Sequence, residues 1–169
     1  MLLRGLRGLE SAGCGVIAIP CNTAHGWYEA MQAACSLPIL HIVAAARAEL
    51  DGVDGPVGLM GTAATLDMGL YQHGLGRECL LPDADTMDRL VTPGIALVKA
   101  NRVAEAYAPL AEAARGLRAR CAAAVVLGCT EIPLGIAAGP PLGFPVVDTV
   151  AALARAAIRY VRGGDSVVR

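Results

Sequence analysis

Two stretches of sequence decide the fold of this chain: VIAIPCNT at residues 16–23 and AVVLGCTE at residues 124–131. Each stretch is an apolar run followed by Pro or Gly, then a cysteine, then small polar residues. The apolar runs are typical of buried strands, and the polar residues after them can begin a helix. We therefore predict that Cys21 and Cys129 each lie where a strand ends and a helix begins.

The same alternation of strands and helices extends outward from these two stretches. Further strands are predicted at residues 39–43, 57–60, 78–81 and 145–147. Helices are predicted at residues 2–12, 23–35, 44–50, 65–74, 86–119 and 148–162, with breaks near Asn101 and Pro109, and residues 132–143 are predicted to form a loop. Strands separated by helices imply right-handed βαβ connections, so the expected class is α/β with parallel sheets.

The composition excludes several classes of protein. Of the 169 residues, 55% are hydrophobic and 17% are charged, which is incompatible with intrinsic disorder. The formal net charge of -1 argues against nucleic acid as a partner. We find no apolar run long enough to span a membrane and no signal peptide, so we expect a cytoplasmic protein whose six cysteines are thiols.

The repeated cysteine predicts a particular chemistry. Ligands of parallel α/β sheets bind at the carboxyl ends of the strands, where Cys21 and Cys129 are both expected. Near a helix N-terminus, a thiol is more readily ionised. Two thiols that face one crevice suit the removal of a proton from one face of a carbon stereocentre and its return to the other face.

The residues also resemble a known family. The segments PCNTAH at residues 20–25 and GCTEIPL at residues 128–134 resemble the paired signatures of the cofactor-independent aspartate/glutamate racemase superfamily. The continuation TEIPL resembles the aspartate racemase branch, and GLMGTAAT at residues 58–65 is similar to the start of that family's second domain. This resemblance implies two pseudo-symmetric parallel-sheet α/β domains with the active site between them. It also implies an amino-acid substrate, no cofactor, no metal and a homodimer.

The resemblance implies a role for each matching residue. Cys21 and Cys129 correspond to the acid/base pair, and Asn22, Thr23 and Thr130 correspond to residues that hold the α-carboxylate and amino group of the substrate.

Three other residues have more than one reading. Lys99, the single lysine, matches a residue that contacts the side-chain carboxylate in aspartate racemases, although a lysine on an apolar helix face normally extends to solvent. Glu131 either positions a substrate amine or caps its helix, and His25 either orients Cys21 or acts as a cap. No other spacing supports a metal site at Cys21 and His25. The remaining cysteines are expected to be small buried hydrophobes: Cys14, Cys35, Cys79 and Cys121.

The chain departs from the family pattern at its N-terminus. Members begin with a strand and a Gly-Gly-Met-Gly-Pro loop, which this sequence lacks, so we expect roughly sixty family residues to be absent there. The expected organisation is a partial N-terminal α/β domain at residues 1–54 and a second α/β domain at residues 55–145. The strand and helix at residues 146–169 are expected to return to the first domain.

Three functions follow from these observations. The first is a racemase for an aspartate-like amino acid that uses two thiols as acid and base. The second is a maleate isomerase-like enzyme, or a racemase of another amino acid, from the same superfamily. The third is a catalytically inactive fragment, because a sheet without its first strand would expose apolar backbone edges.

Overall fold

A pair of short parallel strands lies in the N-terminal part of the computed structural model, which describes residues 2–163. Strands β1 (Ile17–Ala18) and β2 (Ile39–Leu40) are in register, with Ile17 opposite Ile39. The helical elements of this part are α1 (Leu2–Ser11), the 3-10 helix η1 (Thr23–Trp27) and α2 (Tyr28–Ala33). Apolar side chains of α1 and α2, among them Leu6 and Met31, pack with Ile17 of β1 and Ile39 of β2 in one small core.

A larger sheet of four parallel strands forms the centre of the rest of the molecule. Its strands, in sheet order, are β4 (Cys79–Leu80), β3 (Val57–Gly61), β5 (Ala124–Gly128) and β6 (Val146–Asp148). Every residue of β3 and β5 is buried. Central parallel strands are covered on both faces, which is why both appear in the sequence as continuous apolar runs.

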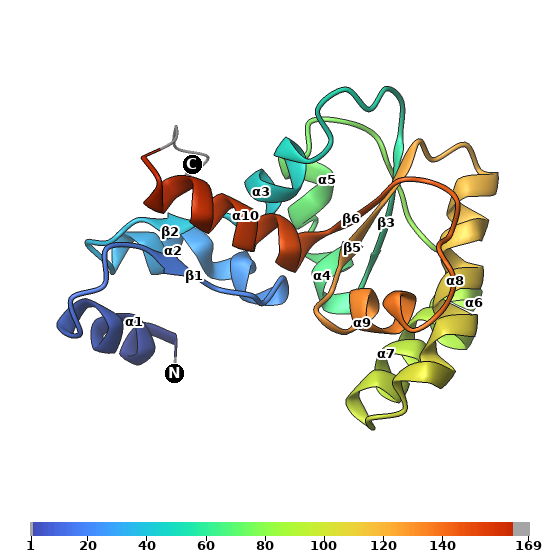
Figure 1. Ribbon diagram of the computed structural model, residues 1–169, viewed down its shortest axis with the longest axis horizontal. Coiled ribbons are helices and arrows are strands. Elements are labelled where there is room, and N and C mark those ends of the chain that lie inside the picture. Colours follow the sequence, from blue (N-terminus) through green and yellow to red (C-terminus); the bar gives the residue numbers. More distant parts are fainter. Residues whose placement is uncertain (1, 164–169) are drawn as a thin grey trace.

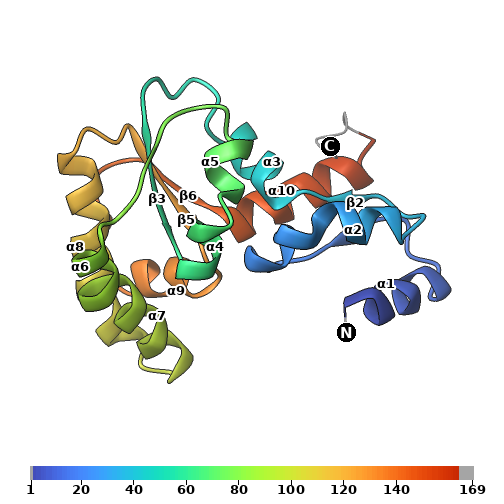
Figure 2. The same ribbon diagram turned by 180° about the vertical axis from the view of Figure 1, so that it is seen from behind.

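Different helices cover the two faces of this sheet (Figures 1 and 2). On one face lie α3 (Ile42–Ala48), α5 (Leu70–Gly74) and α10 (Thr149–Val161), and on the other lie α7 (Thr92–Lys99), α8 (Val103–Ala119) and α9 (Glu131–Ala137). Successive side chains of β5 point to opposite faces of the sheet. Val126 packs with the helices of the first face and Val125 with those of the second. The remaining elements are α4 (Ala63–Asp67), α6 (Ala84–Thr86) and the π-helical turn η2 (Met87–Val91). The fold is therefore α/β, as the sequence predicts.

The C-terminal segment connects the two sheets. Helix α10 packs along α3 and contacts β1 and β2, as Figure 1 shows. Strand β6, however, pairs with β5 and belongs to the larger sheet, although we expected the strand and the helix of residues 146–169 to return together to the first domain. The free edge of β5 explains the difference, because Val147 becomes buried when β6 pairs there. Residues 164–169 lie outside the described part of the chain.

Two predictions based on proline are wrong. Residues 132–137, which belong to the loop predicted at residues 132–143, lie in helix α9, and Pro133 occupies its first turn, where a backbone N–H has no helical partner in any case. A break in the helix is predicted near Pro109, which instead lies inside α8. The buried face of α8, which includes Ala106 and Leu110, packs against the sheet and outweighs the local cost of the proline.

Two details of the N-terminal part also differ from expectation. Residues 23–27, predicted to begin an α-helix that runs to residue 35, instead form the 3-10 helix η1, at whose end Trp27 is 53% exposed. His41, expected within a strand, instead caps α3, and its ring accepts a hydrogen bond from the backbone N–H of Val43. Within residues 2–163, no helix combines the length and the apolar character that crossing a bilayer requires.

Candidate active site

Cys21 lies just after β1, in the turn that leads into η1, and it is exposed. His25 holds this turn in place, because its Nδ1 lies 2.9 Å from the backbone oxygen of Cys21. The His25 ring is 2% exposed, and burial lowers its pKa, which favours the neutral form. His25 therefore contacts the backbone of Cys21 and not its thiol.

A second histidine packs edge-on against His25. The ring centroids of His25 and His41 are 5.3 Å apart. Burial, and to a smaller extent the neighbouring His25, lowers the pKa of His41 to about 4. Both rings are thus neutral at physiological pH and act as packing and hydrogen-bonding groups behind the turn of Cys21.

Cys129 lies just after β5, at the carboxyl end of the larger sheet, and is 5% exposed. Its thiol donates a hydrogen bond of 3.0 Å to Oε2 of Glu131. Desolvation, followed by this contact with the Glu131 carboxylate, raises the pKa of Cys129 to about 11, even though backbone N–H groups of Glu131 and Ile132 act in the opposite direction. In the ligand-free protein, Cys129 is therefore a protonated thiol.

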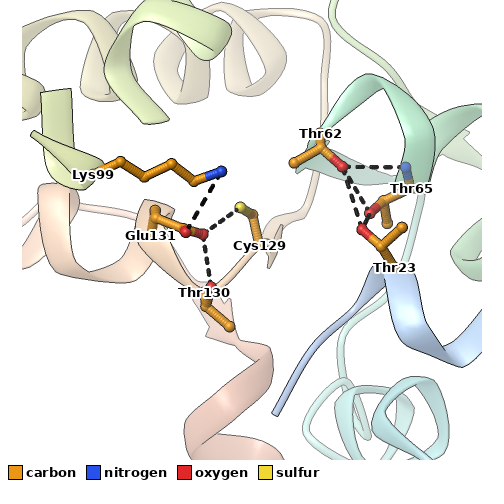
Figure 3. A network of polar contacts seen from close by, with 7 residues as sticks. All are labelled: Thr23, Thr62, Thr65, Lys99, Cys129, Thr130 and Glu131. Atoms are coloured by element: carbon orange, nitrogen blue, oxygen red, sulfur yellow. Dashed lines mark hydrogen bonds and ion pairs between the residues drawn. The ribbon is translucent and has the colours of Figure 1, made fainter. Parts of the chain in front are cut away.

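The carboxylate of Glu131 contacts three side chains, those of Cys129 and Thr130 in the turn between β5 and α9 and that of Lys99 in α7. Thr130 Oγ1 donates to Oε2 at 2.6 Å, and Lys99 Nζ from the end of α7 lies 3.8 Å from Oε1. Desolvation opposes ionisation of Glu131, but the hydrogen bonds from Cys129 and Thr130, together with the charge of Lys99, lower its pKa. Figure 3 shows these four side chains as one group.

A second polar group, made of hydroxyls, faces the first across the site. Thr23 Oγ1 lies 2.8 Å from Thr65 Oγ1, which in turn lies 3.0 Å from Thr62 Oγ1 (Figure 3). Thr62 and Thr65 are absent from the residues predicted from sequence. The pairing of β3 with β5 could have identified them, since Gly61 lies opposite Gly128 and Thr62 therefore follows β3 where Cys129 follows β5.

These groups surround a cavity of about 150 Å3. It is lined by Cys21, Asn22, Thr23, Thr62, Thr65, Lys99, Gly128, Cys129, Thr130 and Glu131. Its volume is similar to that of an engineered cavity of roughly 150 Å3 that accepts benzene, so the site suits a small molecule. Seven of the eight predicted site residues line the cavity, and only His25 lies behind it.

The charges around the cavity are few. Lys99 and Glu131 are its charged lining residues, and the two thiols complete its set of ionisable groups. Among residues 2–163, no three His, Cys, Asp or Glu side chains gather closely enough to hold a metal ion. The cavity therefore contains one thiol that follows a strand of each sheet, hydroxyl and amide groups that can form hydrogen bonds, and one lysine.

The fold and the paired cysteines define the class of this protein. Residues 1–157 match the model of the Asp/Glu/hydantoin racemase family, and the chain belongs to that family. Its structure is similar to that of the aspartate racemase of Picrophilus torridus, with a TM-score of 0.80 and 28% sequence identity. That comparison covers 97% of this chain and 69% of the other.

Two curated relatives show the same family relationship in sequence. The broad specificity amino-acid racemase RacX of Bacillus subtilis is 38% identical over 85 residues, which are 48% of this chain and 37% of RacX. The glutamate racemase of Geobacter metallireducens is 28% identical over 158 residues, which are 89% of this chain and 58% of that enzyme. The matched regions therefore span about a third to three fifths of these curated relatives.

Proposed function

We propose that this chain is an amino-acid racemase that needs no pyridoxal phosphate and acts on an aspartate-like substrate with two thiols. The observation that carries the proposal is the position of the two cysteines. Cys21 follows a strand of the small sheet, Cys129 follows a strand of the large sheet, and both line one cavity. Family membership supports the racemase activity, and Lys99 in the cavity supports a substrate with a side-chain carboxylate.

The proposed reaction removes the α-proton from one face of the substrate and adds a proton to the opposite face. One cysteine thiolate takes the α-proton, and the electron pair of the broken C–H bond remains on the substrate as a carbanion-like intermediate. The opposite thiol then gives its proton to the other face of the α-carbon and becomes a thiolate. Hydrogen bonds from Asn22, Thr23 and Thr130 are proposed to hold the α-carboxylate, where negative charge develops.

The experiment is exchange of the α-proton in D2O, followed by NMR. The protein should introduce deuterium at the α-position of aspartate and convert each enantiomer into the other. Cys21→Ala and Cys129→Ala should each abolish racemisation, whereas Cys121→Ala, which alters an exposed cysteine outside the cavity, should not. Racemisation that persists in both cavity variants would contradict the two-thiol mechanism.

The same assay separates the other functions. Conversion of maleate without exchange at aspartate would identify a diacid isomerase, and exchange at other amino acids alone would identify a different racemase. No exchange with any of these compounds would identify an inactive chain. The cytoplasmic location and the homodimer also remain proposals. The six cysteines, all free thiols in the structure, support a reducing compartment, and light scattering would test for the dimer.

A further inference from the structure

The carboxylate of Glu131 lies beside the thiol of Cys129, and no carboxylate of residues 2–163 makes such a contact with Cys21. We propose that Glu131 is a positioning residue that keeps Cys129 protonated in the free protein, so that Cys21 is the thiol that takes the first proton. This inference rests on the two-thiol racemisation proposed above and assigns a starting direction to it.

The geometry of Glu131 favours this role. Its Oε2 accepts hydrogen bonds from both Cys129 Sγ and Thr130 Oγ1, at 3.0 and 2.6 Å, while its Oε1 faces Lys99. Because both carboxylate oxygens have partners, the side chain is held in one orientation with Oε2 toward the thiol. Its side chain is 22% exposed, so water screens the contact only in part.

The electrostatic consequence is that Cys129 is difficult to ionise. A thiolate there would place a negative charge 3.0 Å from the Glu131 carboxylate, in a residue that is 5% exposed. The other ionisable groups around the cavity are Lys99 and Cys21. Lys99 contacts the far oxygen of Glu131 at 3.8 Å with 60% of its side chain exposed, so it offsets this repulsion weakly.

Cys21 has no such neighbour. It is exposed, and within residues 2–163 its thiol has no hydrogen-bond partner. The two cysteines therefore occupy equivalent positions in sequence, after matching strands, while their surroundings differ in burial and in charge. This difference arises from the Thr-Glu that follows Cys129, where Cys21 is followed by Asn-Thr.

The difference has a consequence for each turnover. When Cys129 has given its proton to the substrate, a thiolate and a carboxylate lie side by side, and Cys21 holds the proton taken from the substrate. Return of a proton to Cys129, with loss of one from Cys21, restores the starting form and relieves the repulsion. In the free protein the form with Cys129 protonated is thus favoured over the form with Cys129 ionised, and it accepts the enantiomer whose α-hydrogen faces Cys21.

Two kinetic results should follow. Because two enantiomers have equal free energies, kcat/KM must be the same in both directions. Because the substrate-free protein prefers the form with Cys129 protonated, kcat should nevertheless differ between the two enantiomers. KM should then differ by the same factor, so that the ratio kcat/KM stays equal. Glu131→Gln removes the charge but keeps the size and a hydrogen-bonding oxygen, so it should bring that factor closer to one.

The decisive experiment is alkylation of the substrate-free protein by iodoacetamide, with mass spectrometry of each cysteine peptide. Only the thiolate reacts, so the rate reports ionisation directly. In the wild type at pH 8, Cys21 should react faster than Cys129. In Glu131→Gln, the rate at Cys129 should rise about tenfold for each unit by which its pKa falls, while exposed Cys121 should react as before.

Two control variants make the result specific. Glu112→Gln removes an exposed carboxylate of α8 outside the cavity and should leave the rate at Cys129 unchanged. Lys99→Met removes a charge from the cavity but leaves the Glu131 carboxylate beside the thiol, so it should not increase the rate at Cys129. An equal increase in all three variants would overturn the proposal.

A measurement on the wild type alone provides a second test, which does not depend on how any variant folds. The alkylation rate at Cys129 should still be rising above pH 9. A midpoint below pH 8, or equal rates at Cys129 in wild type and folded Glu131→Gln, would overturn the role of Glu131. A different result is also informative: the alkylation rates could follow the expected pattern while no α-proton exchange occurs. That result would reject the racemase function and leave the effect of Glu131 on Cys129 established.

Discussion

Asn22 is a buried amide whose two ends have different surroundings. It is 3% exposed, and its Oδ1 accepts a short hydrogen bond from the hydroxyl of fully buried Tyr71. Its Nδ2 has no partner among the described residues, and Asn22 lines the cavity. Because Tyr71 fixes the oxygen end, the nitrogen end remains available to donate to an acceptor such as a carboxylate.

Replacement of Tyr71 by Phe tests this arrangement. The variant leaves Asn22 Oδ1 buried without its donor, which should lower the free energy of unfolding by about 1–3 kcal/mol. The freed amide should also bind substrate less well, so KM should rise more than kcat falls. Denaturant unfolding and steady-state kinetics measure the two effects.

Tyr107→Phe is the matched control for this prediction. The Tyr107 hydroxyl donates to the backbone oxygen of Pro140 at the surface, so its loss should change stability by less than about 0.5 kcal/mol. Equal losses of stability in both variants, with unchanged KM in both, would contradict a special role for Tyr71.

At the scale of elements, α9 shows how close packing positions the site. This helix begins with Glu131, and its Gly135 faces α8, where an added Cβ would lie 2.5 Å from Leu110 Cδ1 and 3.1 Å from Ala106 Cβ. The missing side chain therefore lets α9 lie directly against α8. This contact holds the carboxylate of Glu131 at the level of Cys129.

Substitution of this glycine by alanine should disturb the contact. Gly135→Ala overpacks the space between α8 and α9 and should destabilise the protein by about 1–3 kcal/mol. Gly116→Ala, on α8, meets nothing within 4 Å and should instead stabilise the helix by roughly 0.5–1 kcal/mol. Thermal unfolding of both variants would check the prediction, and equal shifts in the same direction would disprove it.

Elements that depend on local patterns could be predicted from the sequence. The central strands β3 and β5 are continuous apolar runs, and the break at Asn101 coincides with a left-handed backbone conformation, φ 59°. A helix start after Cys129 could be predicted, but the extent of α9 could not, because Pro133 and Gly135 favour a loop locally. It is helical because Ile132 and Gly135 become buried against α8, a contact that local sequence does not encode.

At the scale of the whole molecule, the two sheets are held together by α10 and α3. Arg155 of α10 makes a two-point ion pair with Glu49 at the end of α3, at 2.9 and 3.0 Å. The cavity is lined from both sheets, so a bound ligand should stabilise the arrangement of the whole chain. Ligand binding in the cavity should therefore increase the free energy of unfolding of the whole chain.

Thermal shift with ligand tests this link and the proposed substrate class. At a concentration of about 100 times its Kd, aspartate should add about 2.7 kcal/mol and raise the unfolding midpoint by about 5–10 °C. Alanine, which lacks a side-chain carboxylate, should give a smaller shift at the same concentration.

Lys99→Met should reduce the shift with aspartate, because it removes the cation proposed to bind the side-chain carboxylate. Arg89→Met is its matched control, since Arg89 is exposed and pairs with Asp85 outside the cavity. Equal shifts for aspartate and alanine in the wild type would rule out selection for an acidic side chain.

The sequence by itself determined the α/β class and the two cysteines at strand ends, because apolar runs, helix starts and turn residues depend on near neighbours in the chain. Only the tertiary structure decided which side chains share the cavity. Thr62 and Thr65 meet Thr23 because α4 packs against η1, and Lys99 reaches Glu131 because α7 and α9 pack together. These contacts depend on strand order and helix packing, which join residues that lie far apart in sequence.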